Sequence, residues 1–544
     1  MQDLLDVYGQ PLLQFILNLP DTEFDGRALS EEQAEASQVL RELCEQTRDQ
    51  DETVRWLNLS SMLTAFVPEL QTSAAIHFRS HCGGATETPL VEDDSIGQNL
   101  LVFARDVYAG FLVKRPASEW MGGMPAAHYL GKHPKFVEFC NSVLKDQRLK
   151  FLFPGHMDTT TANSFAELIG VSSITFTVAG GGGGMQLVML VDNILRSAYA
   201  RCSLNDEVSL AHFLRVTLDV LEELRELAAG RSVSVPVAVG LVNVSFADLD
   251  RLSLPNGELR RVREADANYV PKSDQTEAVL TFEVPFKLLA KKKVPDDDSF
   301  LDHGPYVPHV EKWRNGLQEA INLRLLAIML ASTSGHRAAA IVISQSVFDP
   351  ISMMPHMSWQ EHAPATTAEK VCIAREEAEQ IQIWTEKVLR EQPKNLGVAM
   401  RRIISAVGTR MDPVDGLVDA VLAWENMFSG TPETSLRVCG SLAILLEPDD
   451  FNKRNSLYGE LAKIYGTRSD IVHGKANEPS TAQVLEQRAR AVEIAVQAMR
   501  RLYEFPDLLQ AENSSVRGKN VMLGRVQAGS QTVAGERSGA GAGE

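Results

Sequence analysis

The stretch Leu457–Lys475, LYGELAKIYGTRSDIVHGK, decides how the C-terminal part of this chain is interpreted. Within it, Arg468 and His473 stand five positions apart, and a glycine and a lysine follow the histidine. At about 100° per residue, a regular helix would point two such side chains about 140° apart. We therefore expect the pair either at the start of a helix or with one side chain reaching around it.

Helical patterns flank this stretch on both sides. Apolar residues recur at spacings of three and four positions over 413–428, 434–446, 451–465 and 481–503, and a further amphipathic pattern covers 367–390. Asp412 is a suitable N-cap before Pro413, which can occupy the first helical position. Because the connections between these segments are short, residues 366–508 are predicted to form an all-α antiparallel bundle.

The first 365 residues have a mixed pattern. Helices are expected over 30–46, 207–229 and 310–332, and β-branched residues with alternating polarity predict strands over 232–246, 278–286 and 338–348. The three prolines of Phe348–Pro364 mark a junction before the bundle. The sequence thus predicts an α+β region over 1–365, with room for two subdomains.

The end of the chain has a different composition. From Asn513 onward it is rich in Gly, Ser and Ala and shows no apolar period. Residues 509–544 are therefore predicted to be a disordered tail.

Charge limits the kinds of partner that the chain can attract. The formal net charge of -18 opposes broad, nonspecific attraction to nucleic acid, which depends on cations that neutralise phosphates. Cationic and anionic side chains are nearly equal in number between 395 and 506, so most of the negative charge lies elsewhere. Any contact with RNA should therefore be local and should lie in the C-terminal part.

Cysteine spacing and the acidic N-terminus indicate a cytoplasmic location. The 6 cysteines are scattered without a C-x-x-C pair, which is typical of reduced thiols, and the acidic start MQDLLDVYGQ is unlike a secretory signal. Leu168–Val191 carries no charge over a length that could cross a bilayer, but its five central glycines favour a strand, a loop and a helix. We expect no membrane span.

The order of helices and the motif together resemble a HEPN domain of the ApeA-like type. The resemblance runs through LAWENMF (Leu422–Phe428), SLRVCGSLAILL (Ser435–Leu446), the stretch Leu457–Lys475 and a final amphipathic helix. It covers roughly a fifth of the chain. It implies a dimeric, metal-independent endoribonuclease that needs no cofactor, often a toxin or an antiviral effector.

The resemblance also assigns roles to residues of the motif. It makes Arg468 and His473 the catalytic pair and puts Ser469 in the polar position that follows the arginine. The region 1–365 would then regulate the nuclease by binding an unknown trigger. This region resembles no family that we can place.

The residue types suit the chemistry independently of the family. Cleavage of RNA by its own 2′-hydroxyl needs a base for that proton, an acid for the departing 5′-oxygen and a cation for the phosphorane charge. Histidine titrates near neutrality, and arginine offers a charged, planar fork that fits phosphate oxygens. Because one motif holds a single histidine, we expect a homodimer whose two-fold axis brings two motifs together.

Several neighbours are supporting candidates. Glu425 could pair with Arg468 or face solvent, and Ser469 lies four positions before His473, close enough on a helix to hydrogen-bond with it. The other candidates are Asp470 as a supporting residue, Tyr465 to stack on a base or simply pack, and Lys463 and Lys475 to contact phosphates or remain solvated.

Other patterns favour ordinary structural roles. Gly180–Gly184 could expose backbone N–H groups to a phosphate, but no Walker lysine follows, and a flexible loop is favoured. His77, His81 and Cys82 have helical spacing without a third ligand nearby, so no metal site is predicted. Two alternatives to the nuclease stay open: a non-catalytic HEPN module that dimerises or binds a nucleotide, and metal-dependent hydrolysis by the N-terminal region.

Overall fold

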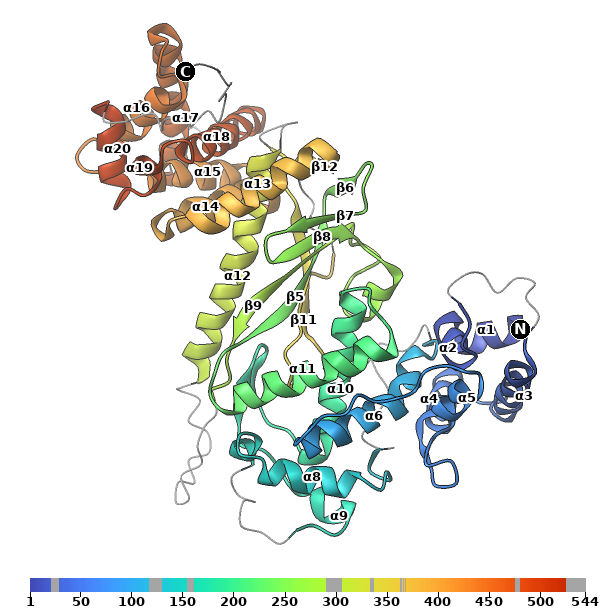
Figure 1. Cartoon of the computed structure of the whole chain (residues 1–544). Coiled ribbons are helices and arrows are strands. Elements are labelled where there is room, and N and C mark those ends of the chain that lie inside the picture. The colour runs from blue at the N-terminus through green and yellow to red at the C-terminus, as the bar shows by residue number, and fades with distance from the viewer. Residues whose placement is uncertain are drawn as a thin grey trace, which may run out of the picture.

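The computed structural model describes residues 1–20, 29–116, 130–153, 161–289, 306–332, 337–362, 364, 366, 368–474 and 480–524 of the 544-residue chain. Figure 1 shows three successive parts: helices near the N-terminus, a central antiparallel sheet and a group of helices at the C-terminal end. The mixed α+β class expected from the sequence is confirmed.

Helices dominate the N-terminal part. Ser30 caps the third helix by accepting a hydrogen bond from the backbone N–H of Gln33, the capping-box arrangement that the sequence allows. The helices are α1 (Gln2–Tyr8), α2 (Gln10–Ile16), α3 (Glu31–Gln46), α4 (Glu52–Thr64), α5 (Ala74–His81), α6 (Ser95–Leu112), α8 (Phe136–Lys145) and α9 (Phe165–Leu168). Strands β1 (Phe66–Val67) and β2 (Thr72–Ser73) form a short hairpin between α4 and α5.

The glycine-rich segment forms a second hairpin. Strand β3 (Phe176–Val178) pairs antiparallel with β4 (Gly181–Gly183), and helix α10 (Leu190–Leu204) follows. A side chain at Gly180 would come within 2.7 Å of the His356 ring, so this close approach requires glycine. The expected strand–loop–helix arrangement is confirmed in outline, and none of the helices in the described ranges is both long and apolar enough to span a bilayer.

The central sheet has six strands in the order β11-β10-β5-β9-β8-β7, and every neighbouring pair is antiparallel. The strands are β5 (Val233–Val242), β7 (Arg251–Leu254), β8 (Gly257–Arg261), β9 (Ala278–Phe286), β10 (Ile341–Val347) and β11 (His356–Trp359). The three strand segments expected from the sequence therefore form the middle of the sheet. Helices α10 and α11 (Leu210–Ala228) lie together near one end of it, where α11 contacts β5.

The long helix α12 (Tyr306–Ala331) connects the sheet to the C-terminal helices (Figure 1). Ile321 and Ile328 belong to the core of the sheet region, whereas Leu326 and Leu330 belong to the core of the bundle. One helix thus contributes to both cores. The boundary expected near residue 365 therefore does not coincide with a boundary between the two cores, because α12 precedes it in the sequence and packs into both.

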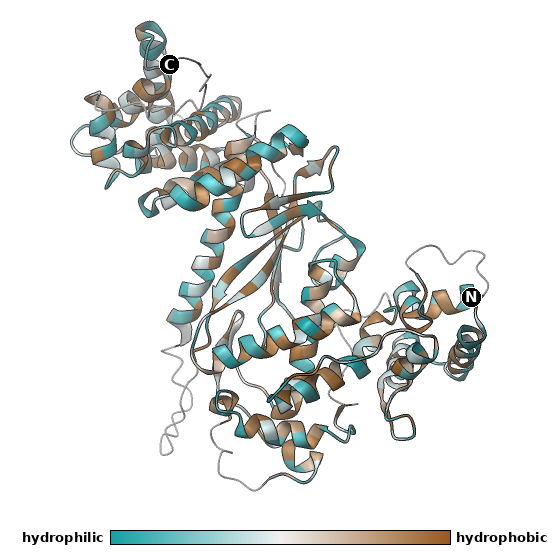
Figure 2. Ribbon diagram, in the orientation of Figure 1, coloured by the Kyte–Doolittle hydropathy of each residue, from teal (hydrophilic) through white to brown (hydrophobic). Residues whose placement is uncertain are grey.

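The C-terminal helices pack around one apolar core. They are α13 (Arg375–Glu391), α14 (Gly397–Ile404), α15 (Pro413–Phe428), α16 (Thr434–Leu446), α17 (Phe451–Val472), α18 (Thr481–Leu502), α19 (Pro506–Leu509) and α20 (Ser514–Met522). Trp424 of α15 is fully buried and donates a hydrogen bond to the carbonyl oxygen of Ala491 on α18. Figure 2 shows hydrophilic and hydrophobic residues alternating along these helices, as expected for amphipathic elements.

Two expectations about this part were wrong. Residues Val371–Ile373 form strand β12 rather than the start of a helix, because they pair in parallel with β6 (Val244–Phe246) of the sheet region. The predicted disordered tail begins too early, because Ser514–Met522 forms α20, where Arg517 is completely buried. Residues 525–544 of that tail lie outside the described residues.

Candidate active site

Helix α17 carries most of the predicted site. Asp450 caps its N-terminus by accepting a hydrogen bond from the backbone N–H of Lys453 at 3.0 Å. The helix runs seven residues beyond the expected end at 465 and stops at Val472. Gly474 then adopts a positive φ of 63°, a conformation that glycine reaches without strain, and its N–H donates to the carbonyl oxygen of Ile471. The glycine of the motif therefore ends the helix.

Arg468 lies against α15, where Glu425 joins it to Tyr465. The Glu425 Oε2 atom accepts a hydrogen bond from Arg468 Nη2 at 3.1 Å, and Oε1 accepts one from the Tyr465 hydroxyl at 2.6 Å. The Arg468 and Glu425 side chains are only 16% and 18% exposed. The predicted pairing of Glu425 with Arg468 is present, and the alternative of a solvent-facing glutamate is wrong.

This small network has one unsatisfied donor. The Nε atom of Arg468 is buried and has no hydrogen-bond partner among the described residues. A buried donor without a partner is costly, so this atom lowers the stability of the network. The bond from Tyr465 to Glu425 also shows that this tyrosine packs against the site.

This environment raises the pKa of the Tyr465 hydroxyl. Burial raises its pKa, and the hydrogen bond to Glu425 and the charge of that carboxylate raise it further. The phenol therefore remains neutral well above its usual range and acts as a hydrogen-bond donor to Glu425.

Replacing Glu425 with glutamine is expected to lower the pKa of Tyr465, because the carboxylate's contribution disappears while burial remains. In the wild-type chain, Tyr465 stabilises the fold below about pH 10, its unfolded value, and this stabilisation is lost as the pH rises through the folded pKa. NMR titration of ring-labelled Tyr465 measures the shift. An unchanged titration in Glu425→Gln would show that the carboxylate does not control the phenol.

His473 occupies a different position from Arg468. It is the C-cap of α17, its backbone N–H donates to the carbonyl oxygen of Ser469 at 3.0 Å, and it is exposed. The pair therefore sits at the end of a helix and not at its start. Within the described residues, no hydrogen bond joins the side chains of Arg468 and His473, as expected for positions about 140° apart.

The remaining predicted residues separate into three groups. Ser469 and Asp470 are half-buried on the last turns of α17, where Ser469 contacts His473 through its backbone oxygen. Lys463 is exposed on another side of the helix and lines a cavity of about 590 Å³ between α17, α18 and the sheet region. Lys475 lies outside the described residues.

The other patterns noted in the sequence have ordinary surroundings. The rings of His77 and His81 stack at 6.5 Å, and the Nε2 atom of His81 lies 3.2 Å from the Glu35 carboxylate. Among the described residues, no three His, Cys, Asp or Glu side chains gather as metal ligands do. The flexible loop expected for Gly180–Gly184 is wrong, because Gly181–Gly183 forms strand β4 and pairs with β3 in a hairpin.

Sequence reasoning missed the residues at the junction between the sheet region and the bundle. Arg337 precedes β10 and Arg488 lies on α18, and the two line one cavity although they are far apart in sequence. One local signal pointed to Arg488: it follows the buried Val484 by four positions, so it falls on the apolar face of its helix. A charged residue at such a position is rarely fully buried unless it is paired.

Comparisons of the chain with protein-family models, with curated proteins and with solved structures found no match.

Proposed function

We propose that this chain is a metal-independent endoribonuclease of the HEPN type, which acts as a homodimer through its helical bundle and is controlled by its N-terminal region. The observation that carries the proposal is the exposure of His473 at the end of α17, one turn beyond the half-buried Arg468–Glu425 pair. An exposed imidazole can be reached by a polynucleotide and by a second subunit. A histidine sealed inside the bundle could do neither.

The chemistry requires two proton transfers. The ribose 2′-oxygen attacks the adjacent phosphorus and the bond to the 5′-oxygen breaks, which gives a 2′,3′-cyclic phosphate and a 5′-hydroxyl. One histidine removes the 2′-hydroxyl proton and another donates a proton to the leaving 5′-oxygen. His473 of one protomer and His473 of the partner subunit supply these roles across a two-fold axis.

Arg468 stabilises the charge that develops on the phosphorane. Its ion pair with Glu425 holds the guanidinium in place, and the single hydrogen bond to Glu425 occupies only one of its donor nitrogens. A positioned guanidinium stabilises a developing negative charge more than a mobile one does, because no reorganisation is needed during the reaction. Val472, which is 52% exposed beside His473, offers apolar surface for the second copy.

A non-catalytic role for the bundle is the second candidate, and one observation favours it. Arg468 is mostly buried and already paired with Glu425, as a structural arginine would be. In that case the bundle would dimerise or bind a nucleotide, and the N-terminal region would carry the specific interaction.

Incubating the full-length protein with a mixed-sequence RNA pool in EDTA distinguishes these functions. The nuclease should cut RNA in the presence of the chelator and should lose this activity in His473→Ala. Absence of cleavage under all conditions would favour the non-catalytic module. Cleavage that EDTA abolishes but His473→Ala does not would point to metal-dependent hydrolysis elsewhere in the chain.

A further inference from the structure

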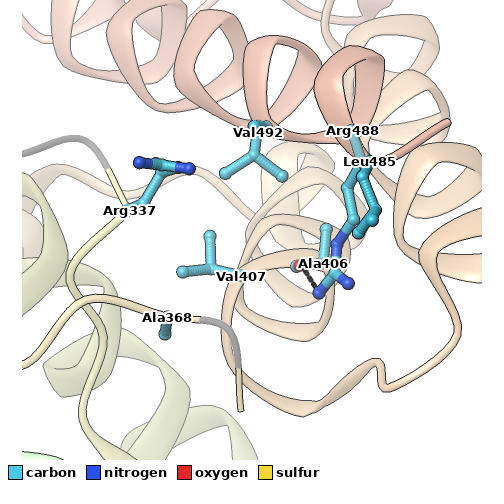
Figure 3. Close-up of a pocket in the computed structure, with 8 residues that line it drawn as sticks. Arg337, Ala368, Ala406, Val407, Leu485, Arg488 and Val492 are labelled. Carbon is cyan, nitrogen blue, oxygen red and sulfur yellow. Dashed lines mark hydrogen bonds between the residues drawn. The ribbon is translucent and has the colours of Figure 1, made fainter. Parts of the chain in front are cut away.

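A cavity of about 190 Å³ lies where the sheet region meets the bundle (Figure 3). Arg337 and Ala368 enclose it from the side of the sheet region, and α18 and the turn after α14 enclose it from the side of the bundle. The lining residues are Arg337, Ala368, Ala406, Val407, Leu485, Arg488, Ala489 and Val492. Among the described residues, the walls therefore combine two arginines with six apolar side chains and contain no acidic residue.

Arg488 places in this wall a positive charge that makes no direct ion pair among the described residues, although Asp412 is near enough to act on it electrostatically. Arg488 is only 4% exposed, and its Nη2 atom donates to the carbonyl oxygens of Ala406 at 2.9 Å and Arg410 at 2.7 Å. Its Nη1 atom is buried without a hydrogen-bond partner among the described residues. Burial lowers the pKa of Arg488, but an arginine remains charged at neutral pH. A buried cation that makes no direct ion pair favours an anion nearby.

Arg337 supplies the second charge. Figure 3 shows its guanidinium extending across the cavity toward Val492. It pairs with Glu369 at 2.8 Å, but both side chains are nearly half exposed, at 47% and 41%. An exposed pair of this kind contributes little, so the guanidinium can turn to a ligand at small cost.

The size and polarity of the cavity limit the class of ligand that it can hold. An apolar cavity of about 150 Å³ holds a benzene molecule, so this one has room for an aromatic ring or a branched chain of similar size. Pockets lined mostly by apolar side chains with a few placed charges are typical of small-molecule sites. The adjoining cavity of about 590 Å³ lacks this bias, because its described lining includes both carboxylates and cations.

We propose that the junction cavity binds a small organic anion, whose apolar body of about the size of benzene packs between Val407 and Val492 and whose anionic group is held by Arg337 and Arg488. Because the walls come from the sheet region and from the bundle, an occupant contacts both parts at once. A small molecule bound there can therefore change how the sheet region packs against the bundle, in which α17 ends at His473.

Calorimetric titration of the full-length protein tests the proposal with four probes. Benzoate and phenyl phosphate supply the anionic group on a ring, benzamide is the neutral isostere of benzoate, and inorganic phosphate lacks the apolar body. We expect one of the two ring anions to bind with a dissociation constant of about 0.1 to 1 mM. Benzamide and inorganic phosphate should bind at least about tenfold more weakly. The stronger ring anion identifies a carboxylate or a phosphate ligand.

Two variants locate the binding. Arg337→Gln removes the exposed charge, and Ala368→Phe fills the cavity without changing the charge, so each should weaken binding by about tenfold or more. Ala368 lines this cavity and not the adjoining one of about 590 Å³. Arg390→Gln is the matched control, since Arg390 is an exposed arginine that pairs with Glu391 at 2.8 Å and does not line the cavity. Failure of both ring anions to bind, equal binding of benzamide, or wild-type affinity in both cavity variants would overturn the proposal. No RNA is present, so the result does not depend on nuclease activity.

Discussion

Replacing His473 with alanine is expected to lower the rate of metal-independent RNA cleavage by about 10²- to 10⁴-fold, the usual contribution of general acid–base catalysis. The fold should be unaffected, because His473 is exposed and its hydrogen bond to Ser469 comes from the backbone. Cleavage of a labelled RNA in EDTA measures the rate, and circular dichroism confirms the fold. His77→Ala is the matched control, since His77 is also exposed but lies on α5.

Mixing the wild-type protein with the His473→Ala variant tests whether the active site is shared between subunits. If the acid and the base come from opposite protomers, a mixed dimer retains only one of the two histidines. An excess of His473→Ala should then suppress the activity of the wild-type protein in proportion to the mixed dimers formed. Activity that stays constant per wild-type chain would show that one protomer is sufficient.

Replacing Arg517 with alanine is expected to destabilise the bundle by about 4 kcal/mol, from the buried acceptors that lose their donor and from the cavity left behind. Arg517 is fully buried, and burial lowers its pKa to about 10. It donates to the carbonyl oxygens of Leu508 at 2.8 Å and Met427 at 3.0 Å, and to the side chain of Asn395 at 3.0 Å. Urea denaturation measures the free energy of unfolding.

Lys519 provides the control for this experiment. It lies on the same short helix α20 but is exposed, so Lys519→Ala should change the free energy of unfolding by no more than about 0.5 kcal/mol. Equal effects of the two substitutions would mean that α20 is not held to the bundle through Arg517. A large effect of Arg517→Ala alone would establish 514–522 as part of the folded unit.

The paired state of Arg468 bears on how the proposed nuclease is controlled. In the described conformation Glu425 holds the guanidinium beside α15, and His473 stands apart at the helix end. Phosphate oxygens would have to share Arg468 with Glu425, and a second subunit would have to add its histidine.

Local sequence determined the elements that depend on neighbouring residues. The helices over 413–428 and 434–446 and the strand over 278–286 have the expected bounds. Asp412 accepts a hydrogen bond from the backbone N–H of Val414 at 2.7 Å, as its predicted role as an N-cap requires. Apolar periodicity and caps act within a few positions, so they are visible in the sequence.

Contacts between segments that are distant in the sequence decided the remaining elements and the arrangement of the site residues. Val371–Ile373 became a strand because β6 lies beside it, and 514–522 became a helix because Arg517 reaches acceptors on three separate segments. The placement of Arg468 against Glu425, the exposure of His473 and the cavity between Arg337 and Arg488 likewise depend on packing between elements. Sequence by itself specified which side chains are present and most of the helices and strands that carry them, because those preferences are local. Only the tertiary structure decided which of them meet, because the free energy of burial depends on neighbours that are remote along the chain.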